Sequence, residues 1–314
     1  MPKISVIVPI YNVEAYVGDC LQSLIKQTLS DIEIICIDDC GKDKSMQIVK
    51  DFAARDERIR IVKNWCNRGL SYSRNHGLKY AHAPYIMFCD SDDMFMSDTC
   101  EKMYNAITEL KTDVIVGNIN VIYEANHDLK ESDAKFFRVP TVGIFDIPEN
   151  NKYICYGSAW GKIYRRNVII NNKLNFPNGL KHEDEFFWPA FCSVARRVGF
   201  IENIVYQYRR RAGSIMNVAY QQNKLNIDPL KILEKYFKYT NKHNVFWGQR
   251  NWFWGIMMPA MLNASINYSG HDKKSECLKF LYKFIKRNWS SYGINTDVQN
   301  KVQNIISHAE SVIH

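Results

Sequence analysis

The chain has 314 residues, of which 46% are apolar and 24% charged, and its net charge is +8. These values are typical of a globular protein, and the sequence shows no long disordered stretch, low-complexity segment or repeat. The moderate positive charge suits anionic partners such as nucleotides or phospholipid headgroups, whereas nucleic acid is disfavoured because no recognisable binding motif occurs.

The cysteines and the apolar runs indicate where the protein resides. Nine cysteines occur without a CxxC pair, and several fall inside apolar runs. Buried, reduced thiols are therefore a better interpretation than a zinc site or a disulfide framework. The first apolar segment is too short for a signal peptide, and the longest later one, Trp252 to Leu262, is about half a membrane span. We expect a cytoplasmic protein that does not cross a membrane.

Strands and helices alternate through the first part of the chain. Short β-branched or apolar runs predict strands at Ile4–Val8, Ile32–Ile37, Arg58–Val62, Tyr85–Cys89 and Asp113–Val121. Apolar residues at helical spacing predict helices at Val17–Gln27, Ser45–Ala54, Leu70–Ala81 and Cys100–Leu110. This alternation predicts an α/β fold, with a Rossmann-like, mostly parallel sheet that has helices on both faces.

Polar side chains follow three of these strands. Tyr11 and Asn12 follow the first, Asp38 and Asp39 the second, and the run Asp90-Ser91-Asp92-Asp93 the fourth. The carboxyl ends of parallel strands form one edge, where ligands bind. Crowded carboxylates repel one another unless a cation such as Mg²⁺ or Mn²⁺ neutralises them. The sequence favours a metal–diphosphate site here, and an acidic turn that caps the next helix is the alternative for the acidic run alone.

Two common nucleotide-binding motifs do not occur in the sequence. There is no GxGxxG after the first strand and no GxxxxGK[ST]. A bound nucleotide would have to be held by carboxylates, an aromatic ring and a metal.

Four motifs, taken in order, closely resemble those of the bacterial family 2 glycosyltransferases, which have the GT-A fold. They are Pro9-Ile10-Tyr11-Asn12, Asp38-Asp39 with Gly41, Asp43 and Ser45, Arg74-Asn75 with Gly77, and Asp90-Ser91-Asp92-Asp93. The resemblance is nearly continuous over residues 3–120 and sparser to residue 216. It implies an inverting enzyme of the capsule or lipooligosaccharide type, with a UDP-sugar donor and Mn²⁺ or Mg²⁺. At Cys40 the chain departs from the serine-like or glycine residues usual in the family.

The resemblance also implies individual roles. The expected donor-binding residues are Pro9, Tyr11, Asn12, Asp39, Arg74, Asp90 and Ser91, and the expected metal ligand is Asp92. Tyr11 would stack on uracil and Asp39 would accept its imide N–H, while a packing aromatic and a turn residue are the alternatives.

Other positions of these motifs carry further expectations. Asp38 would orient its loop. Arg74 would lie near the diphosphate, unless it is a surface arginine of its helix. Asp90 would face the ribose or a metal-bound water, and Asp93 the donor sugar or the metal.

A second acidic stretch, His182-Glu183-Asp184-Glu185, opens a predicted helix. Acids in a first helical turn are favoured by the helix dipole, which is the simpler explanation. The resemblance implies that Asp184 is the catalytic base, with Glu183 as the second candidate. His182 is expected to form local hydrogen bonds.

Three more segments of the second half carry predictions. Residues 122–150 are expected to be an irregular connecting or acceptor-side loop. Ser158–Arg165 resembles the segment that enters the acceptor-binding part, where Trp160 would stack on a sugar or pack in the core. Tyr206–Met216 resembles a closing strand and mobile loop with arginines that meet the diphosphate. The signature QxxRW does not occur, which disfavours a processive synthase.

The last part of the chain is predicted to be helical. Ile232, Leu233 and Tyr236 suggest one helix, and Asp272–Trp289 has the pattern of a basic amphipathic helix. Such a helix binds membrane surfaces or partner helices, or packs its apolar face in the core and exposes its basic face.

These expectations combine into one functional hypothesis. Residues 1–120 would bind the nucleotide sugar, 121–220 would bind the acceptor, and 221–314 would form a helical region at a membrane surface or partner. The enzyme would transfer a sugar to a hydroxyl of a glycan or glycolipid at the cytoplasmic face of the inner membrane, in cell-surface polysaccharide or lipooligosaccharide synthesis. Transfer to a polyprenyl phosphate and a non-catalytic nucleotide-sugar-binding protein are the alternatives.

Overall fold

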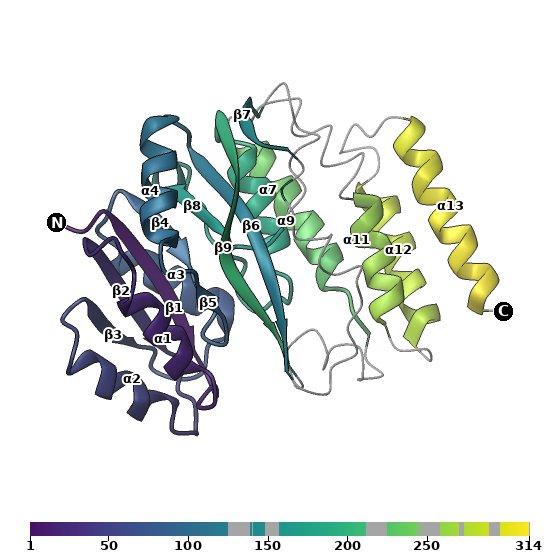
Figure 1. The fold of residues 1–314 in the computed structure, drawn as a ribbon. Helices are drawn as coiled ribbons and strands as arrows, with labels where there is room; N and C mark the ends of the chain where they lie inside the picture. Colours follow the sequence, from purple (N-terminus) through teal and green to yellow (C-terminus); the bar gives the residue numbers. More distant parts are fainter. Residues whose placement is uncertain are drawn as a thin grey trace.

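The computed structural model describes residues 1–124, 139, 141–147, 157–211, 225–243, 245, 258–269, 273–288 and 296–313. Figure 1 shows a central sheet with helices on both of its faces, followed by a group of helices that ends at the C-terminus. The two termini lie at opposite sides of the molecule in this view. The predicted α/β architecture with a helical C-terminal extension is confirmed.

The strands of the described residues form one sheet, in the order β3-β2-β1-β4-β8-β6-β9-β5, and β7 pairs with β9. Strands β1 to β4 are all parallel, as predicted. Beyond β4 the sheet is mixed, because β8 runs antiparallel to β4 and β6, whereas β6 and β9 are parallel. The strands are β1 (Ile4–Ile10), β2 (Ile32–Asp38), β3 (Ile59–Lys63), β4 (Tyr85–Phe88), β5 (Met94–Phe95), β6 (Val114–Tyr123), β7 (Gly143–Asp146), β8 (Lys162–Arg165) and β9 (Arg197–Arg210).

Helices cover both faces of this sheet. They are α1 (Val17–Ile25), α2 (Ser45–Ala53), α3 (Leu70–Tyr80), α4 (Thr99–Glu109), α6 (Arg166–Asn171), α7 (Asp184–Cys192), α9 (Asp228–Lys242), α11 (Met258–Tyr268), α12 (Lys274–Asn288) and α13 (Thr296–Ile313). Helices α1, α2 and α4 pack with one face of β1, and α7 and α9 belong to the core on the other face. Burial on both sides explains why β1 is a continuous apolar run rather than an alternating one.

Helix α3 approaches the sheet closely because of a glycine. A Cβ built on Gly77 would lie 2.4 Å from Cγ2 of Ile7 in β1, so any larger side chain would push the helix away. The close packing matters for function, because α3 carries Arg74, which is buried with 1% exposure. The alternative that Arg74 is a surface arginine is therefore wrong.

The prediction of an irregular segment over residues 122–150 is wrong in its described part. Strand β6 continues to Tyr123, and Gly143–Asp146 forms β7, which pairs antiparallel with the first residues of β9. The sequence of β7 is too short to signal a strand alone, and its pairing with a distant strand decides its conformation. Strand β9 also begins at Arg197, nine positions before the predicted start at Tyr206.

The C-terminal helices form their own layer of the core. Helix α9 was predicted and buries Ile232, Leu233 and Tyr236, whereas α13 lies in the region predicted to be helical but was not predicted as a separate helix. In α12, Cys277, Leu278 and Leu281 are buried, which supports the alternative of a core-packed helix with an exposed basic face. Within the described residues, no helix has the length and apolar character needed to span a membrane.

Candidate active site

The first part of the site is the loop after β2, where Asp39 is 3% exposed. Its Oδ1 accepts hydrogen bonds from Nδ2 of Asn64 at 2.7 Å and the N–H of Arg68 at 2.8 Å. Its Oδ2 accepts the N–H of Gly69 at 2.8 Å, just before α3 begins. A carboxylate has about four acceptor positions, so these three bonds hold Asp39 rigidly and leave Oδ2 able to accept one more.

Neighbouring residues shape the same loop. Asp38 Oδ1 accepts the N–H of Cys40 at 2.9 Å, which is the loop-orienting role expected of Asp38. Asn12 Oδ1 accepts the N–H of Lys42 at 2.8 Å and ties the β1 loop to the β2 loop. The ring of Tyr11 is 46% exposed, so the alternative of a packing aromatic is not supported. Pro9 is buried inside β1, beside Ile37 of β2. These residues leave an aromatic ring and a fixed acceptor at the carboxyl edge of the sheet.

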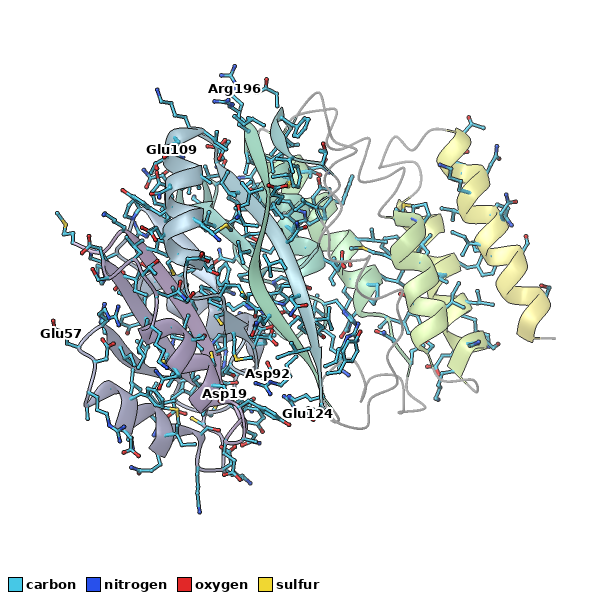
Figure 2. All side chains as sticks on the ribbon, in the orientation of Figure 1. Asp19, Glu57, Asp92, Glu109, Glu124 and Arg196 are labelled. Atoms are coloured by element: carbon cyan, nitrogen blue, oxygen red, sulfur yellow. The ribbon has the colours of Figure 1, made fainter. Side chains whose placement is uncertain are left out.

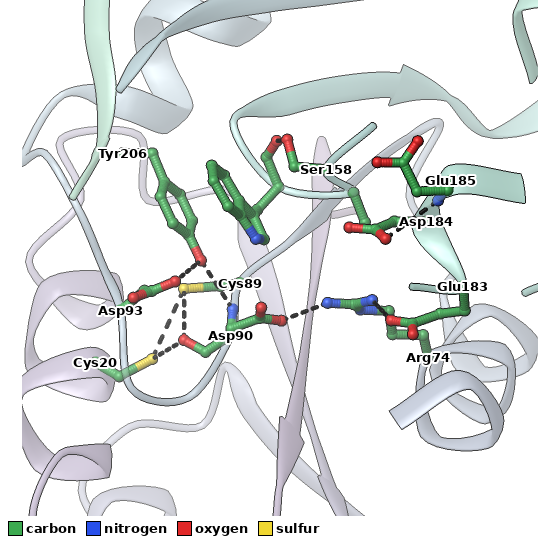
Figure 3. Close-up of polar contacts among 12 residues, drawn as sticks. Cys20, Arg74, Cys89, Asp90, Asp93, Ser158, Glu183, Asp184, Glu185 and Tyr206 are labelled. Atoms are coloured by element: carbon green, nitrogen blue, oxygen red, sulfur yellow. Dashed lines mark hydrogen bonds and ion pairs between the residues drawn. The ribbon is translucent and has the colours of Figure 1, made fainter. Parts of the chain in front are cut away.

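The acidic loop after β4 is held to β9 by Asp93. The Tyr206 hydroxyl accepts the N–H of Asp90 at 3.1 Å and donates to Asp93 Oδ2 at 2.7 Å (Figure 3). Asp93 Oδ1 accepts the N–H of Arg209 at 2.7 Å. Burial, Asp92 and Asp90 together raise the pKa of Asp93 well above its ordinary value. Both oxygens of Asp93 are thus used within the protein, and Ser91 is buried in the same loop.

Asp92 lies nearer the surface of the loop. Its Oδ2 is 2.8 Å from Nε of Arg211, and the two side chains are 22% and 17% exposed. The backbone carbonyl oxygen of Asp92 accepts a hydrogen bond from Nε of Arg209 at 3.0 Å. Burial and the charge of Asp90 raise the pKa of Asp92, whereas Arg211 lowers it. The arginines predicted to meet the diphosphate therefore contact the acidic loop itself.

The donor atoms of this loop fit a hard divalent cation only in part. The described residues contain no group of three or more His, Cys, Asp or Glu side chains placed to hold a metal. Asp90 and Asp92 offer carboxylate oxygens from a single loop, and Mg²⁺ usually binds through one or two carboxylates together with substrate phosphates. The residues present thus fit a metal that is shared with a diphosphate.

Arg74 connects the acidic loop to the second acidic stretch. Its Nη2 lies 2.6 Å from Asp90 Oδ1, and its Nη1 donates to Glu183 Oε1 (Figure 3). Burial opposes its charge, but Asp90 and Glu183 raise the pKa of the guanidinium above its ordinary value. The residue before helix α7 is thereby joined to the end of β4, although the two are about ninety positions apart in the chain.

The acids of α7 are held in three different ways. Glu183, directly before the helix, is 6% exposed and bound to Arg74, so it does not cap the helix through its side chain. Asp184 Oδ1 accepts the N–H of Glu185 at 3.1 Å. Burial raises the pKa of Asp184, while the charges of Arg74 and His182 lower it. Asp184 and Glu185 are both partly exposed, whereas Glu183 is buried.

Glu185 is a residue that the sequence interpretation overlooked. Burial raises its pKa to about 7, with Asp184 adding to the shift and Lys162 opposing it. A Cβ at Gly157 would lie 2.6 Å from Glu185 Oε1, so the glycine leaves room for this carboxylate. The run of three acids could have indicated it, because neighbouring acids in one helical turn compete for a limited number of cations.

Trp160 does not offer a free face. It is 7% exposed, and its ring stacks on Tyr206 with centroids 4.9 Å apart and on Tyr208 with centroids 5.1 Å apart. This supports the alternative of a core tryptophan. Tyr206 was also overlooked, and its spacing of two from Tyr208 in a strand was the available signal.

Comparison with solved structures defines the fold. Staphylococcus aureus TarS residues 1–349, in complex with UDP-GlcNAc, superposes with a TM-score of 0.62 at 23% identity, over 99% of this chain and 82% of that chain. The mannosyltransferase PcManGT from Pyrobaculum calidifontis, in complex with GDP-Man and Mn²⁺, gives 0.56 at 12% identity, over 99% and 87%. The fold is that of the GT-A glycosyltransferases.

Sequence comparison then gives the family. Residues 5–171 match the model of glycosyl transferase family 2, and the chain belongs to this family. The glycosyltransferase GlyA of Streptococcus pneumoniae is 36% identical over 218 residues, which are 67% of this chain. The chain spans 31% of the length of GlyA, so the likeness concerns only part of that protein.

Proposed function

We propose that this chain is an inverting glycosyltransferase that transfers a sugar from a UDP-sugar to a hydroxyl of a cell-surface glycan. The observation that carries the proposal is the Arg74 bridge, which joins Asp90 at the donor edge to Glu183 beside Asp184. One buried guanidinium thus links the acidic loop to a helix start where the pKa of Asp184 is raised, and this link supports a shared site.

The donor end suits a nucleotide with an imide N–H. Asp39 Oδ2 retains acceptor capacity, and the exposed ring of Tyr11 can stack on a flat base. Uracil presents an imide N–H to such an acceptor. TarS, which shares the fold, was solved with UDP-GlcNAc, and this supports the choice of a UDP-sugar.

Mn²⁺ or Mg²⁺ would be held by Asp92, with Asp90 in its outer sphere, and would stabilise negative charge on the leaving diphosphate. PcManGT carries Mn²⁺ within the same fold, which supports a metal-assisted reaction. In this chain, Asp93 and Tyr206 hold the loop that bears Asp92 in position.

Asp184 is the residue that we assign as general base. Its Oδ1 accepts the N–H of Glu185, which leaves Oδ2 to receive the proton of the acceptor hydroxyl. The raised pKa improves proton transfer, because a base works best when its pKa is near the working pH. The hydroxyl oxygen would then attack the anomeric carbon from the face opposite the leaving nucleotide and invert its configuration. Glu183 is less suited, because Arg74 occupies it.

The C-terminal region gives weaker support for a membrane-associated acceptor than the donor side gives for a UDP-sugar. On α12, Phe280 and Tyr282 are 41% and 43% exposed, and Lys279 and Lys283 are exposed beside them. Such a mixture suits the headgroup region of a membrane on its cytoplasmic side.

The proposal is tested with purified protein, Mn²⁺ and a panel of UDP-sugars and GDP-sugars. We expect one UDP-sugar to raise the melting temperature in the presence of Mn²⁺, because a ligand of the native state stabilises it. The same donor should be transferred to a glycan acceptor or slowly hydrolysed. A preference for GDP-sugars, or no transfer and no hydrolysis of any donor, would contradict the proposal. Glu109→Gln, at the end of helix α4 and away from Asp92 in Figure 2, should leave donor binding and transfer unchanged.

A further inference from the structure

Arg211 occupies a place at the acidic loop that the proposed metal would need. Its Nε lies 2.8 Å from Asp92 Oδ2, the oxygen of the acid that we assign as metal ligand. Arginine and a divalent cation are both positive, and both would be drawn to this carboxylate. Arg211 and a cation therefore compete for Asp92.

The three acids of the loop differ in how tightly their partners are held. Asp90 is paired with Arg74, which is 1% exposed inside helix α3. Asp93 is bonded to the Tyr206 hydroxyl and to a backbone N–H of β9. Neither partner can leave without disturbing an element of the fold.

Arg211 can leave by rotating its side chain. It follows the last residue of β9, so its backbone lies outside the strand pairings of the described sheet. In the same conformation its guanidinium lies 4.9 Å from the ring centroid of Tyr16, an aromatic face that would still attract the cation if it turned away from Asp92. The strand pairings of the described sheet therefore do not fix Arg211, and a cation can replace its guanidinium at Asp92.

The guanidinium would need a new anion once Asp92 is taken. A nucleoside diphosphate supplies it, because a guanidinium binds phosphate oxygens through two parallel hydrogen bonds. The donor would bring this anion to the same loop, since the diphosphate would share the metal with Asp92. Metal entry and diphosphate binding would therefore favour each other.

We propose that Arg211 holds the place of the divalent cation at Asp92 and moves to the donor diphosphate when the cation enters, so that metal and nucleotide bind together. The inference rests on the proposed function, since it assumes the Asp92 metal site. It adds that a divalent cation binds weakly when the donor is absent, because Arg211 already neutralises Asp92.

Mn²⁺ binding, measured by electron paramagnetic resonance of the free ion, tests this exchange without measuring turnover. For the unchanged protein we expect weak binding of Mn²⁺ alone and at least about tenfold tighter binding with saturating UDP. Arg211→Gln should bind Mn²⁺ alone about tenfold tighter than the unchanged protein and gain less from UDP. Arg211→Lys should behave more like the unchanged protein, because it keeps the charge.

Two further variants make the result unambiguous. Arg196→Gln removes an exposed arginine on the edge of the sheet opposite Asp92 in Figure 2 and should change nothing. Asp92→Asn should abolish Mn²⁺ binding with or without UDP. If Mn²⁺ binds the Arg211→Gln protein no tighter than the unchanged one, the exchange is wrong while the metal site stands. If no Mn²⁺ binds even with UDP, both the exchange and the metal-assisted function are overturned.

Discussion

The acidic loop Asp90–Asp93 and the acidic start of α7, Glu183–Glu185, are similar in sequence and opposite in surroundings. In the loop, each acid has a partner from another element: Arg74 for Asp90, and groups of the β9 segment for the other two. At α7 the Arg74 guanidinium binds Glu183 directly and acts on Asp184 through its charge. Our proposals assign ion exchange to the loop and proton transfer to the helix start, and this difference in partners is what they rest on.

Arg74 makes the comparison sharper, because it serves both regions at once. It neutralises one carboxylate on each side, as Figure 3 shows. Its charge limits the rise in the pKa of Asp184 that burial causes. The two regions are thus coupled by a single charge, and four substitutions can separate their roles.

The largest effect is expected for Asp184→Asn, which removes the proposed base and keeps the shape. Transfer should fall by about 10²–10⁴-fold, the usual contribution of general base catalysis. Binding of UDP and Mn²⁺, measured by thermal shift, should not change, because the donor side is intact. Glu109→Gln is the control, because it also replaces one carboxylate by an amide, and it should leave transfer unchanged. Retained activity would instead favour the alternative acceptor, a polyprenyl phosphate, whose oxygen is already anionic.

Arg74→Ala should cause the largest loss of stability. It leaves the buried Glu183 and the half-buried Asp90 without their cation, and breaking a buried ion pair typically costs about 3–5 kcal/mol. The free energy of unfolding is measured in urea. Arg55→Ala, at an exposed position, should change it by no more than about 0.5 kcal/mol. Equal losses for the two variants would show that the bridge does not couple the regions.

Glu185→Gln should change how stability depends on pH. The pKa of Glu185 is raised to about 7 in the folded protein. In the unfolded chain it is near 4.3, so the folded state binds the proton more tightly. The contribution of protonated Glu185 to the free energy of unfolding is therefore complete at low pH and is lost as pH rises through about 7.

The corresponding measurement compares unfolding at about pH 5 and about pH 8. Over this interval the free energy of unfolding of the unchanged protein should fall by about 1–3 kcal/mol more than that of the Glu185→Gln protein. Glu57→Gln, an exposed control, should follow the unchanged protein. A Glu185→Gln protein with the full pH-dependent loss would mean that this acid is ionised in the fold, as in the loop region.

Tyr206→Phe should have the smallest effect and tests the loop region alone. It removes the hydroxyl that joins the Asp90 N–H to Asp93, at a cost of about 1–2 kcal/mol. The dissociation constant of UDP with Mn²⁺, measured by calorimetry, should rise several-fold. Tyr80→Phe, with a 39% exposed ring, is the matched control. Unchanged UDP affinity would indicate that the loop does not need this support.

Much of the donor half was predictable from local patterns. The four parallel strands follow from short β-branched runs, and their shared carboxyl edge follows from their parallel order. Strand β7 and the start of β9 were not predictable, because their pairing joins residues far apart in sequence. The roles of Tyr11, Asn12, Asp39 and Asp92 toward a donor remain predictions.

The sequence by itself determined the α/β class, the family and the position of both acidic stretches. It did so because periodicity and motif spacing are local properties of the chain. Only the tertiary structure decided the partner of each acid. Arg74, Tyr206 and Arg211 reach the acidic loop from α3, β9 and the residue after β9, and these contacts exist only when the elements pack. Ionisation and exchange depend on burial and nearby charge, which a linear sequence does not contain.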